Sequence, residues 1–189
     1  MVNISDIAAM GGSPVAVVNA LWARQGAVAG NILQGMVAAS QAYQVPIVGG
    51  HTNLRSNQEQ LSVAILGRAN QLLSSFAAQP GQNVIAVVDL RGAYRPPFLN
   101  WNAATEAPPE RLRGDLAQLP EIARKGLASA AKDISQAGVL GTLTMLLESS
   151  KVGAEIELER IPKPKHVRWQ DWLCSFPSFG FLFAADGAK

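Results

Sequence analysis

The chain has 189 residues, of which 48% are hydrophobic and 16% are charged, and its formal net charge is +2. This composition is that of a globular protein with one domain or two small ones, and it excludes an intrinsically disordered chain. The small net charge predicts no nucleic-acid partner. The single cysteine, Cys174, excludes an internal disulfide, and its neighbours Trp172, Leu173 and Phe176 favour a packed thiol over a catalytic one.

The apolar stretches of the sequence are interrupted by glycine, proline or polar residues well before the roughly 18 residues that a membrane span needs. The first residues lack the basic region and apolar run of a signal peptide. We therefore expect a cytoplasmic protein with no membrane partner.

The first ninety residues predict alternating helices and strands. A short helix ends before Gly11-Gly12, and either Asn3 or Ser5 is available to cap its start. An apolar stripe at helical spacing predicts a second helix over 27–43. Runs of β-branched or alternating apolar residues predict four strands, over 15–21, 45–48, 61–66 and 82–90.

The composition changes at residue 91. Four prolines with aromatic residues among them predict a structured connector over 91–109. Beyond it the patterns predict three helices and two strands. The helices are expected over 121–135, 139–151 and 169–176, and the strands over 154–158 and 179–184. Because helices and strands mix without strict alternation, we expect an α+β fold.

Common nucleotide and metal motifs are absent from the sequence, including the G-x-x-x-x-G-K-[ST] loop, G-x-G-x-x-G, H-E-x-x-H and C-x-x-C. The two histidines, His51 and His166, are too few for a histidine-rich metal site. A metal here would therefore be a hard ion held by carboxylate and phosphate oxygens.

Three polar segments could carry chemistry, and each also has an ordinary structural explanation. Asp6 lies near the start of a helix, where a carboxylate offsets the helix dipole. The paired glycines Gly49 and Gly50 allow a backbone to approach a ligand closely, but they also make turns. Asp133 and Ser135 lie between two predicted helices, where either side chain could serve as a local cap.

In combination and order, these segments resemble a known superfamily. The run Ser-Asp-x-x-Ala-Met-Gly-Gly-x-Pro at 5–14 is followed by Gly-Gly-His-Thr at 49–52 and by Asp-Ile-Ser with Gly-Val-Leu at 133–140. The ordered set resembles the aminoimidazole ribonucleotide (AIR) synthetase, selenophosphate synthetase and thiamine-monophosphate kinase superfamily. A strand at 152–156 is similar as well, and the connector suggests a separate AIR synthase-related subgroup.

The resemblance implies a role for each matching residue. Asp6 matches a magnesium ligand, and Asp133 and Ser135 match a catalytic segment that faces the substrate. Four residues match a loop near the nucleotide phosphates, namely Gly49, Gly50, His51 and Thr52. The synthetase and kinase branches often have an acidic residue at the position of His51. In this respect the sequence is closer to the selenophosphate branch. The implied chemistry is ATP- and Mg²⁺-dependent phosphorylation of a small-molecule acceptor, in a homodimer whose first-domain strands form a shared barrel.

The resemblance also implies a domain division. Residues 1–90 match the later part of an ATP-binding domain, and residues 110–189 match the early part of a second domain. The family carries a glycine-rich stretch with further aspartates before the segment that matches Asp6, and this sequence does not contain it. We therefore expect a fragment that is inactive alone. The alternatives are a non-catalytic dimeric module of the same fold and one half of a split enzyme.

The connector matches none of the well-known branches. Because specificity must differ where a subgroup departs from the common motifs, we expect its Arg95, Trp101 and Asn102 to contact the acceptor. The alternative is a proline-aromatic loop that only packs over the core.

Overall fold

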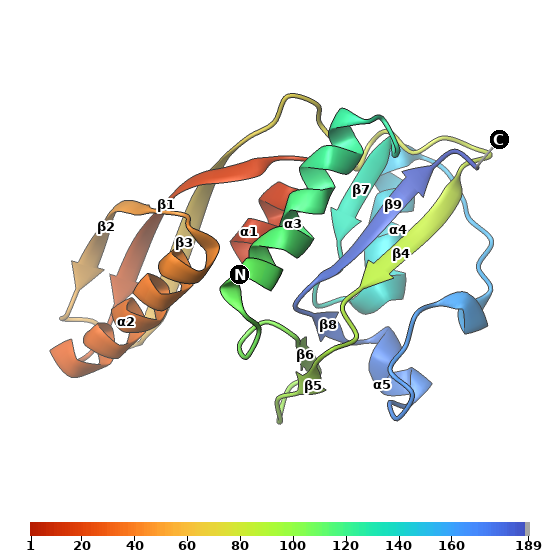
Figure 1. Cartoon of the computed structure of the whole chain (residues 1–189). Helices are drawn as coiled ribbons and strands as arrows, with labels where there is room; N and C mark the ends of the chain where they lie inside the picture. Colours follow the sequence, from red (N-terminus) through yellow and green to blue (C-terminus); the bar gives the residue numbers. More distant parts are fainter. Residues whose placement is uncertain (188–189) are drawn as a thin grey trace.

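The computed structural model describes residues 1–187 of the chain. These residues form three three-stranded sheets, and Figure 1 shows helices between and beside the two larger ones. In the first sheet the strand order is β2-β1-β3, where β1 (Ser13–Trp22) is parallel to β2 (Ile47–Asn53) and antiparallel to β3 (Gln60–Arg68). Helix α2 (Gly26–Tyr43) makes the crossover that the parallel pair requires.

The second sheet has the order β4-β9-β7, and both of its pairs are antiparallel. It consists of β4 (Asn83–Val88), β9 (Gly180–Ala185) and β7 (Ala130–Asp133). Every residue of the central strand β9 is buried. Because side chains alternate along a strand, Phe181 and Phe183 pack against α1 (Val2–Ala9) and α3 (Pro109–Arg124), while Leu182 packs against α4 (Gly138–Ser150).

Helix α1 connects the two sheets, since it contacts both β3 and β7. The side chain of Asn3 donates a hydrogen bond to the backbone oxygen of Val63 on β3 (3.1 Å). Gly67 leaves room for Ile7, because a Cβ at residue 67 would collide with the Ile7 side chain. The helix therefore lies tightly on the first sheet and presents its other side to the second sheet.

A small third sheet forms below the second one, in the order β5-β6-β8. Its strands are β5 (Ala93–Tyr94), β6 (Asn100–Asn102) and β8 (Phe176–Pro177), with the short helix α5 (Trp169–Leu173) beside them. A 3-10 helix, η1 (Leu158–Arg160), lies in the segment before α5. The connector therefore contains regular structure, as its prolines and aromatic residues predict, and Trp101 is buried within it.

The α+β class is confirmed, and several predicted elements need correction. Neither Asn3 nor Ser5 caps α1, because both lie inside the helix. The strand expected at 45–48 runs instead from 47 to 53. The strand expected to be buried at 15–21 is half-exposed on β1. The helix expected over 121–135 is wrong, because this region contains the end of α3 and then strand β7, separated by Gly126 with φ +62°.

Two further observations concern the remaining predictions. The strand expected at 154–158 is not part of any sheet among the described residues. Within residues 1–187, no helix combines the length and the apolar character that crossing a membrane would require.

Candidate functional site

Two carboxylates from different parts of the chain, Asp6 and Asp133, lie near each other where α1 meets the end of β7. Asp133 is the last residue of β7 and pairs with Phe181 of β9. The backbone N–H of Ile134 donates to the oxygen of Gly180 (2.8 Å) and fixes the end of the strand. Asp133 shares a strand face with Ala131, which packs in the core cluster with Ile4 of α1.

The electrostatics of Asp6 reflect this neighbour. Partial desolvation raises the pKa of Asp6, and the negative charge of Asp133 raises it further. The ammonium group of Lys132 acts in the opposite direction and lowers the pKa of Asp6. The two carboxylates therefore repel each other when both are ionised, and a cation held between them would stabilise both.

The loop that follows Asp133 is held rigidly at the start of α4. The backbone N–H of Ser135 donates to the hydroxyl of the fully buried Thr142 (3.2 Å). Gly138 has φ +69°, and a Cβ there would collide with the backbone oxygen of Leu173. Both contacts fix the loop backbone, while the Ser135 hydroxyl makes no side-chain hydrogen bond to the described residues. The loop can therefore present this hydroxyl to a ligand.

The family resemblance implied a loop at Gly49 to Thr52. In the structure this segment is instead part of strand β2. Gly50 pairs with Asn19 of β1, and a Cβ at Gly50 would lie 2.6 Å from the Asn19 backbone oxygen. The glycine is thus required by close strand packing. His51 and Thr52 are exposed on this edge strand, on the far side of the molecule from β7 (Figure 1). Within one copy of the chain, these residues are not brought to Asp6 and Asp133.

The metal-binding capacity of the described residues is limited. Among residues 1–187, no group of three or more His, Cys, Asp or Glu side chains could hold a metal ion. Asp6 and Asp133 form a pair, which fits a hard divalent cation that takes one or two protein carboxylates and completes its shell with phosphate and water oxygens.

The three connector residues predicted to contact an acceptor have different environments. Trp101 is buried; its ring nitrogen donates to the Asp89 backbone oxygen (3.0 Å), and it packs edge-to-face on two other aromatic rings. The Asn102 side chain accepts hydrogen bonds from the backbone N–H groups of Ala104 and Thr105 (3.1 Å each). Only Arg95 is exposed, and it lines a cavity of about 420 Å³ that Arg91 and Arg111 also line.

A second hollow joins the connector to the loop after Asp133, and sequence reasoning missed it. Its volume is about 390 Å³, and its lining includes Phe98, Asn100, Gln136 and Cys174. Phe98 is 67% exposed, so its ring is open to the hollow. The packed thiol that the neighbours of Cys174 predicted is wrong, because Cys174 is exposed. The one available signal was an apolar residue directly after the Pro96-Pro97 pair.

Comparison with known proteins identifies the fold and the family. Residues 1–69 match the N-terminal domain of AIR synthase related protein, and residues 85–189 match its C-terminal domain. The chain belongs to the AIR synthase related family. The resemblance inferred from the ordered motifs is thereby confirmed.

Three members of the AIR synthase superfamily illustrate the relationship. The Synechocystis protein sll0787 is 49% identical over 97% of this chain, and the match covers 58% of that protein. The thiamine-monophosphate kinase of Rhodopirellula baltica is 33% identical over 85% of this chain and 48% of its own length. The structure of AaThiL complexed with AMPPCP and TMP has a TM-score of 0.76 at 21% identity, covering 98% of this chain and 66% of that one.

These comparisons establish the AIR synthase-like fold over nearly the whole chain. The chain spans about half to two thirds of the length of the three proteins. Asp6 lies in the match to the N-terminal family domain, and Asp133 lies in the match to the C-terminal domain. The carboxylate pair is therefore made by both family domains together.

An ion-pair cluster anchors the connector of this family member to α3. Arg91 binds Asp89 through two hydrogen bonds (2.8 and 3.1 Å) and reaches Asp115 on α3 (2.8 Å). Burial acts to raise the pKa of Asp89, but the hydrogen bonds and charge of Arg91, together with the charge of Arg111, lower it below its ordinary value. The Asp89 carboxylate therefore stabilises the fold in its ionised form.

Proposed function

We propose that this chain contributes to an ATP- and Mg²⁺-dependent phosphotransferase or synthetase that phosphorylates or activates a small-molecule acceptor. The observation that carries the proposal is the proximity of Asp6 and Asp133, whose charges interact although they come from two family domains. The relative from Rhodopirellula baltica, a thiamine-monophosphate kinase, supports the reaction class.

The carboxylate pair suits phosphoryl transfer. Asp6 and Asp133 would hold one Mg²⁺ ion, and the bound ion would neutralise charge on the nucleotide phosphates. Lys132 adds a positive charge beside them, since it already acts on Asp6. The Ser135 hydroxyl, on a backbone fixed by Thr142, would donate a hydrogen bond to a phosphate or acceptor oxygen.

The hollow beside this loop suits a small acceptor. Its volume of about 390 Å³ falls within the usual range of small-molecule sites. Phe98 would offer a stacking face and Gln136 an amide, while Ser135, next to Gln136, would face the transferred group. Arg95 would act from the neighbouring cavity on a negatively charged part of the acceptor.

A homodimer completes the proposal. The first sheet exposes several large apolar side chains, including Val18 (44%), Val48 (64%) and Leu66 (64%), and a second copy would cover them. In such a dimer, Gly49, Gly50, His51 and Thr52 on the edge strand β2 would approach a nucleotide shared between copies. Sedimentation velocity at micromolar concentration should show a dimer that Leu66→Asp dissociates. A clean monomer before substitution would contradict this part of the proposal.

Calorimetric titration with AMPPCP tests the nucleotide site. We expect binding that requires Mg²⁺ and that Asp6→Asn and Asp133→Asn each weaken by at least about tenfold, as for lost metal ligands. The exposed Glu59→Gln variant is the matched control and should bind like the unchanged chain. AMPPCP binding that does not require Mg²⁺, or that neither aspartate substitution weakens, would contradict the proposal.

A non-catalytic dimeric module is the second candidate, favoured by the lack of any metal-ligating group of three or more side chains within residues 1–187. On the same ground, we expect no steady ATP hydrolysis by this chain alone. A steady ATPase signal that Asp6→Asn abolishes would contradict that expectation. Absence of any Mg²⁺-dependent AMPPCP binding would favour the module over the enzyme.

A further inference from the structure

Arg111 on α3 carries a charge that the fold satisfies only in part. Its side chain is 24% exposed. One terminal nitrogen, Nη2, donates to the backbone oxygen of Ala103 (2.6 Å) and lies 3.7 Å from a carboxylate oxygen of Asp89. The Nε–H is buried and has no hydrogen-bond partner among the described residues. Because a buried N–H of a cation is costly without an acceptor, this one points to an acceptor from outside the chain.

The Arg111 side chain lines the cavity of about 420 Å³ beside the connector. We call it the connector cavity, and it is bounded by residues 91–95, 102–103, 106–108 and 111. Arg95 also lines it, is exposed, and forms no ion pair or side-chain hydrogen bond with the described residues. Arg91, by contrast, is already held by Asp89 and Asp115. Two arginines, Arg95 and Arg111, therefore have donors to offer a ligand.

The backbone around the connector cavity favours the same kind of ligand. Gly92 lies so close to the next strand that a Cβ there would be 2.6 Å from the backbone oxygen of Asn102, so this wall carries no side chain. Ala107 and Pro108, which immediately precede α3, form another part of the lining. The positive end of the α3 dipole therefore borders the cavity, and no side chain of the described residues caps it.

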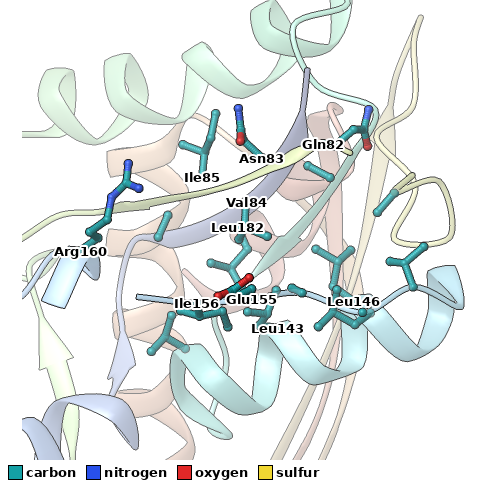
Figure 2. A pocket seen from close by; sticks show the side chains of 18 of the residues that line it. Gln82, Asn83, Val84, Ile85, Leu143, Leu146, Glu155, Ile156, Arg160 and Leu182 are labelled. Atoms are coloured by element: carbon teal, nitrogen blue, oxygen red, sulfur yellow. The ribbon is translucent and has the colours of Figure 1, made fainter. Parts of the chain in front are cut away.

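A larger hollow in the same molecule has a different character. It measures about 930 Å³, and Figure 2 shows apolar side chains around it, including Val84, Ile85 and Leu143. Arg160 is the single arginine or lysine among its described lining residues, and Glu157 pairs with it (3.4 Å). The connector cavity is therefore distinguished by its available arginine donors and not by its size.

We propose that the connector cavity binds an oxyanion, either a phosphate or a carboxylate group, through Arg111 and Arg95. The Nε–H of Arg111 and the guanidinium of Arg95 would donate to its oxygens, because planar guanidinium groups match the geometry of these anions. The positive end of α3 would add to the attraction. Glu106 also lines the cavity and is exposed, so its negative charge would oppose the anion and limit the affinity.

The oxyanion belongs to the small-molecule acceptor, which is then an acidic compound that carries a phosphate or a carboxylate. This assignment of the ligand rests on the proposed function. The anion site itself does not, because it uses neither Asp6 nor Asp133 and requires no Mg²⁺ or nucleotide. The two proposals can therefore fail separately.

Nuclear magnetic resonance of the arginine side chains tests the anion site. Inorganic phosphate and, in a separate series, acetate are titrated into the isotope-labelled chain, with the ionic strength held constant by NaCl and without Mg²⁺ or nucleotide. We expect the Nε–H signal of Arg111 to move saturably with at least one of the two anions. Tighter binding of phosphate would assign a phosphorylated ligand, and tighter binding of acetate would assign a carboxylate.

Four variants, followed at the backbone amides of Gly92 and Ala107, sharpen the test. Arg111→Lys keeps the charge but removes the Nε–H and should weaken anion binding about tenfold. Arg95→Gln should weaken it about threefold, and Glu106→Gln should strengthen it by a similar factor. Arg24→Gln is the matched control, because it removes an exposed arginine far along the chain and should leave binding unchanged.

Several outcomes would overturn the proposal. One is an Arg111 Nε–H signal that neither anion moves, or that NaCl alone moves equally. Another is a loss for Arg24→Gln as large as that for Arg95→Gln, which would show attraction by net charge only. A third is a loss of phosphate binding in Asp6→Asn, which would place the anion at the carboxylate pair. If circular dichroism shows that Arg111→Lys misfolds, the opposite effects expected at residues 95 and 106 still decide the question.

Discussion

The two large sheets of this chain have similar apolar strands but very different surroundings. In the second sheet, β9 lies between α4 on one face and α1 with α3 on the other, and all six of its residues are buried. In the first sheet, β1 is the central strand, yet Leu21 is its one fully buried residue. The difference indicates that the second sheet contributes most of the buried core, whereas the first sheet presents an exposed apolar surface.

The largest expected effect compares one residue in each central strand. Leu182 on β9 is 1% exposed, and Val18 on β1 is 44% exposed. Leu182→Ala should lower the free energy of unfolding by about 3 kcal/mol, because it leaves a cavity in a closed core. Val18→Ala should cost about 0.5 kcal/mol or less in the monomer. Urea unfolding measures both, and equal losses would contradict the contrast between the sheets.

A smaller expected effect is the difference in stability loss between alanine substitutions at two glycines near the second sheet. Both Gly138 and Gly126 have positive φ, but a Cβ at Gly126 meets nothing within 4 Å, whereas one at Gly138 collides with Leu173. Gly126→Ala should cost about 1 kcal/mol from backbone strain alone. Gly138→Ala should cost at least about 2 kcal/mol, since the loop and α5 must also move apart. If thermal unfolding gives the same loss for both, the crowding at Gly138 is not decisive.

The connector offers a finer comparison within one loop. Asn102→Ala removes two hydrogen bonds to the backbone and should lower the free energy of unfolding by about 1 kcal/mol. Arg95→Ala removes an exposed side chain and should leave stability unchanged within about 0.5 kcal/mol. In a completed enzyme, Arg95→Ala should instead raise the acceptor KM. A destabilised Arg95→Ala protein with normal kinetics per folded molecule would make Arg95 part of the scaffold.

The smallest expected effect is a pH dependence at the end of β4. The pKa of Asp89 is lowered in the folded state. The stabilisation of the fold by ionised Asp89 is therefore complete above the unfolded pKa of about 3.9. That contribution is lost as the pH falls through the lower, folded pKa. The stability difference between the unchanged chain and Asp89→Asn should therefore shrink between about pH 5 and pH 2. A difference that stays constant over this range would show that the ionised form is not what stabilises the fold.

The sequence predicted the elements whose patterns are local. The stripe of α2 and the apolar run of β9 each carry their own periodicity, and both helix and strand were found close to the expected bounds. The helix expected over 121–135 failed for a physical reason. Its alanines favour a helix locally, but Ala130 and Ala131 pair with β9 and are buried there, so tertiary pairing overrides propensity.

The candidate site was predictable only in part. Motif order pointed to Asp6 and Asp133 separately, but their proximity depends on α1 lying between two sheets, which no local pattern contains. The strand position of Gly49 to Thr52 was missed because paired glycines favour turns in isolation. Here Gly50 is required by its close approach to Asn19 on the neighbouring strand.

The most direct test of the central claim is a double-mutant cycle on divalent-cation binding, with Mn²⁺ in place of Mg²⁺ and bound metal counted by electron paramagnetic resonance. Asp6→Asn and Asp133→Asn should each weaken Mn²⁺ binding in the presence of AMPPCP by about tenfold. The double variant should bind scarcely more weakly than either single one, because both carboxylates hold the same ion. Losses that simply multiply, or single variants that bind like the unchanged chain, would contradict a shared metal site.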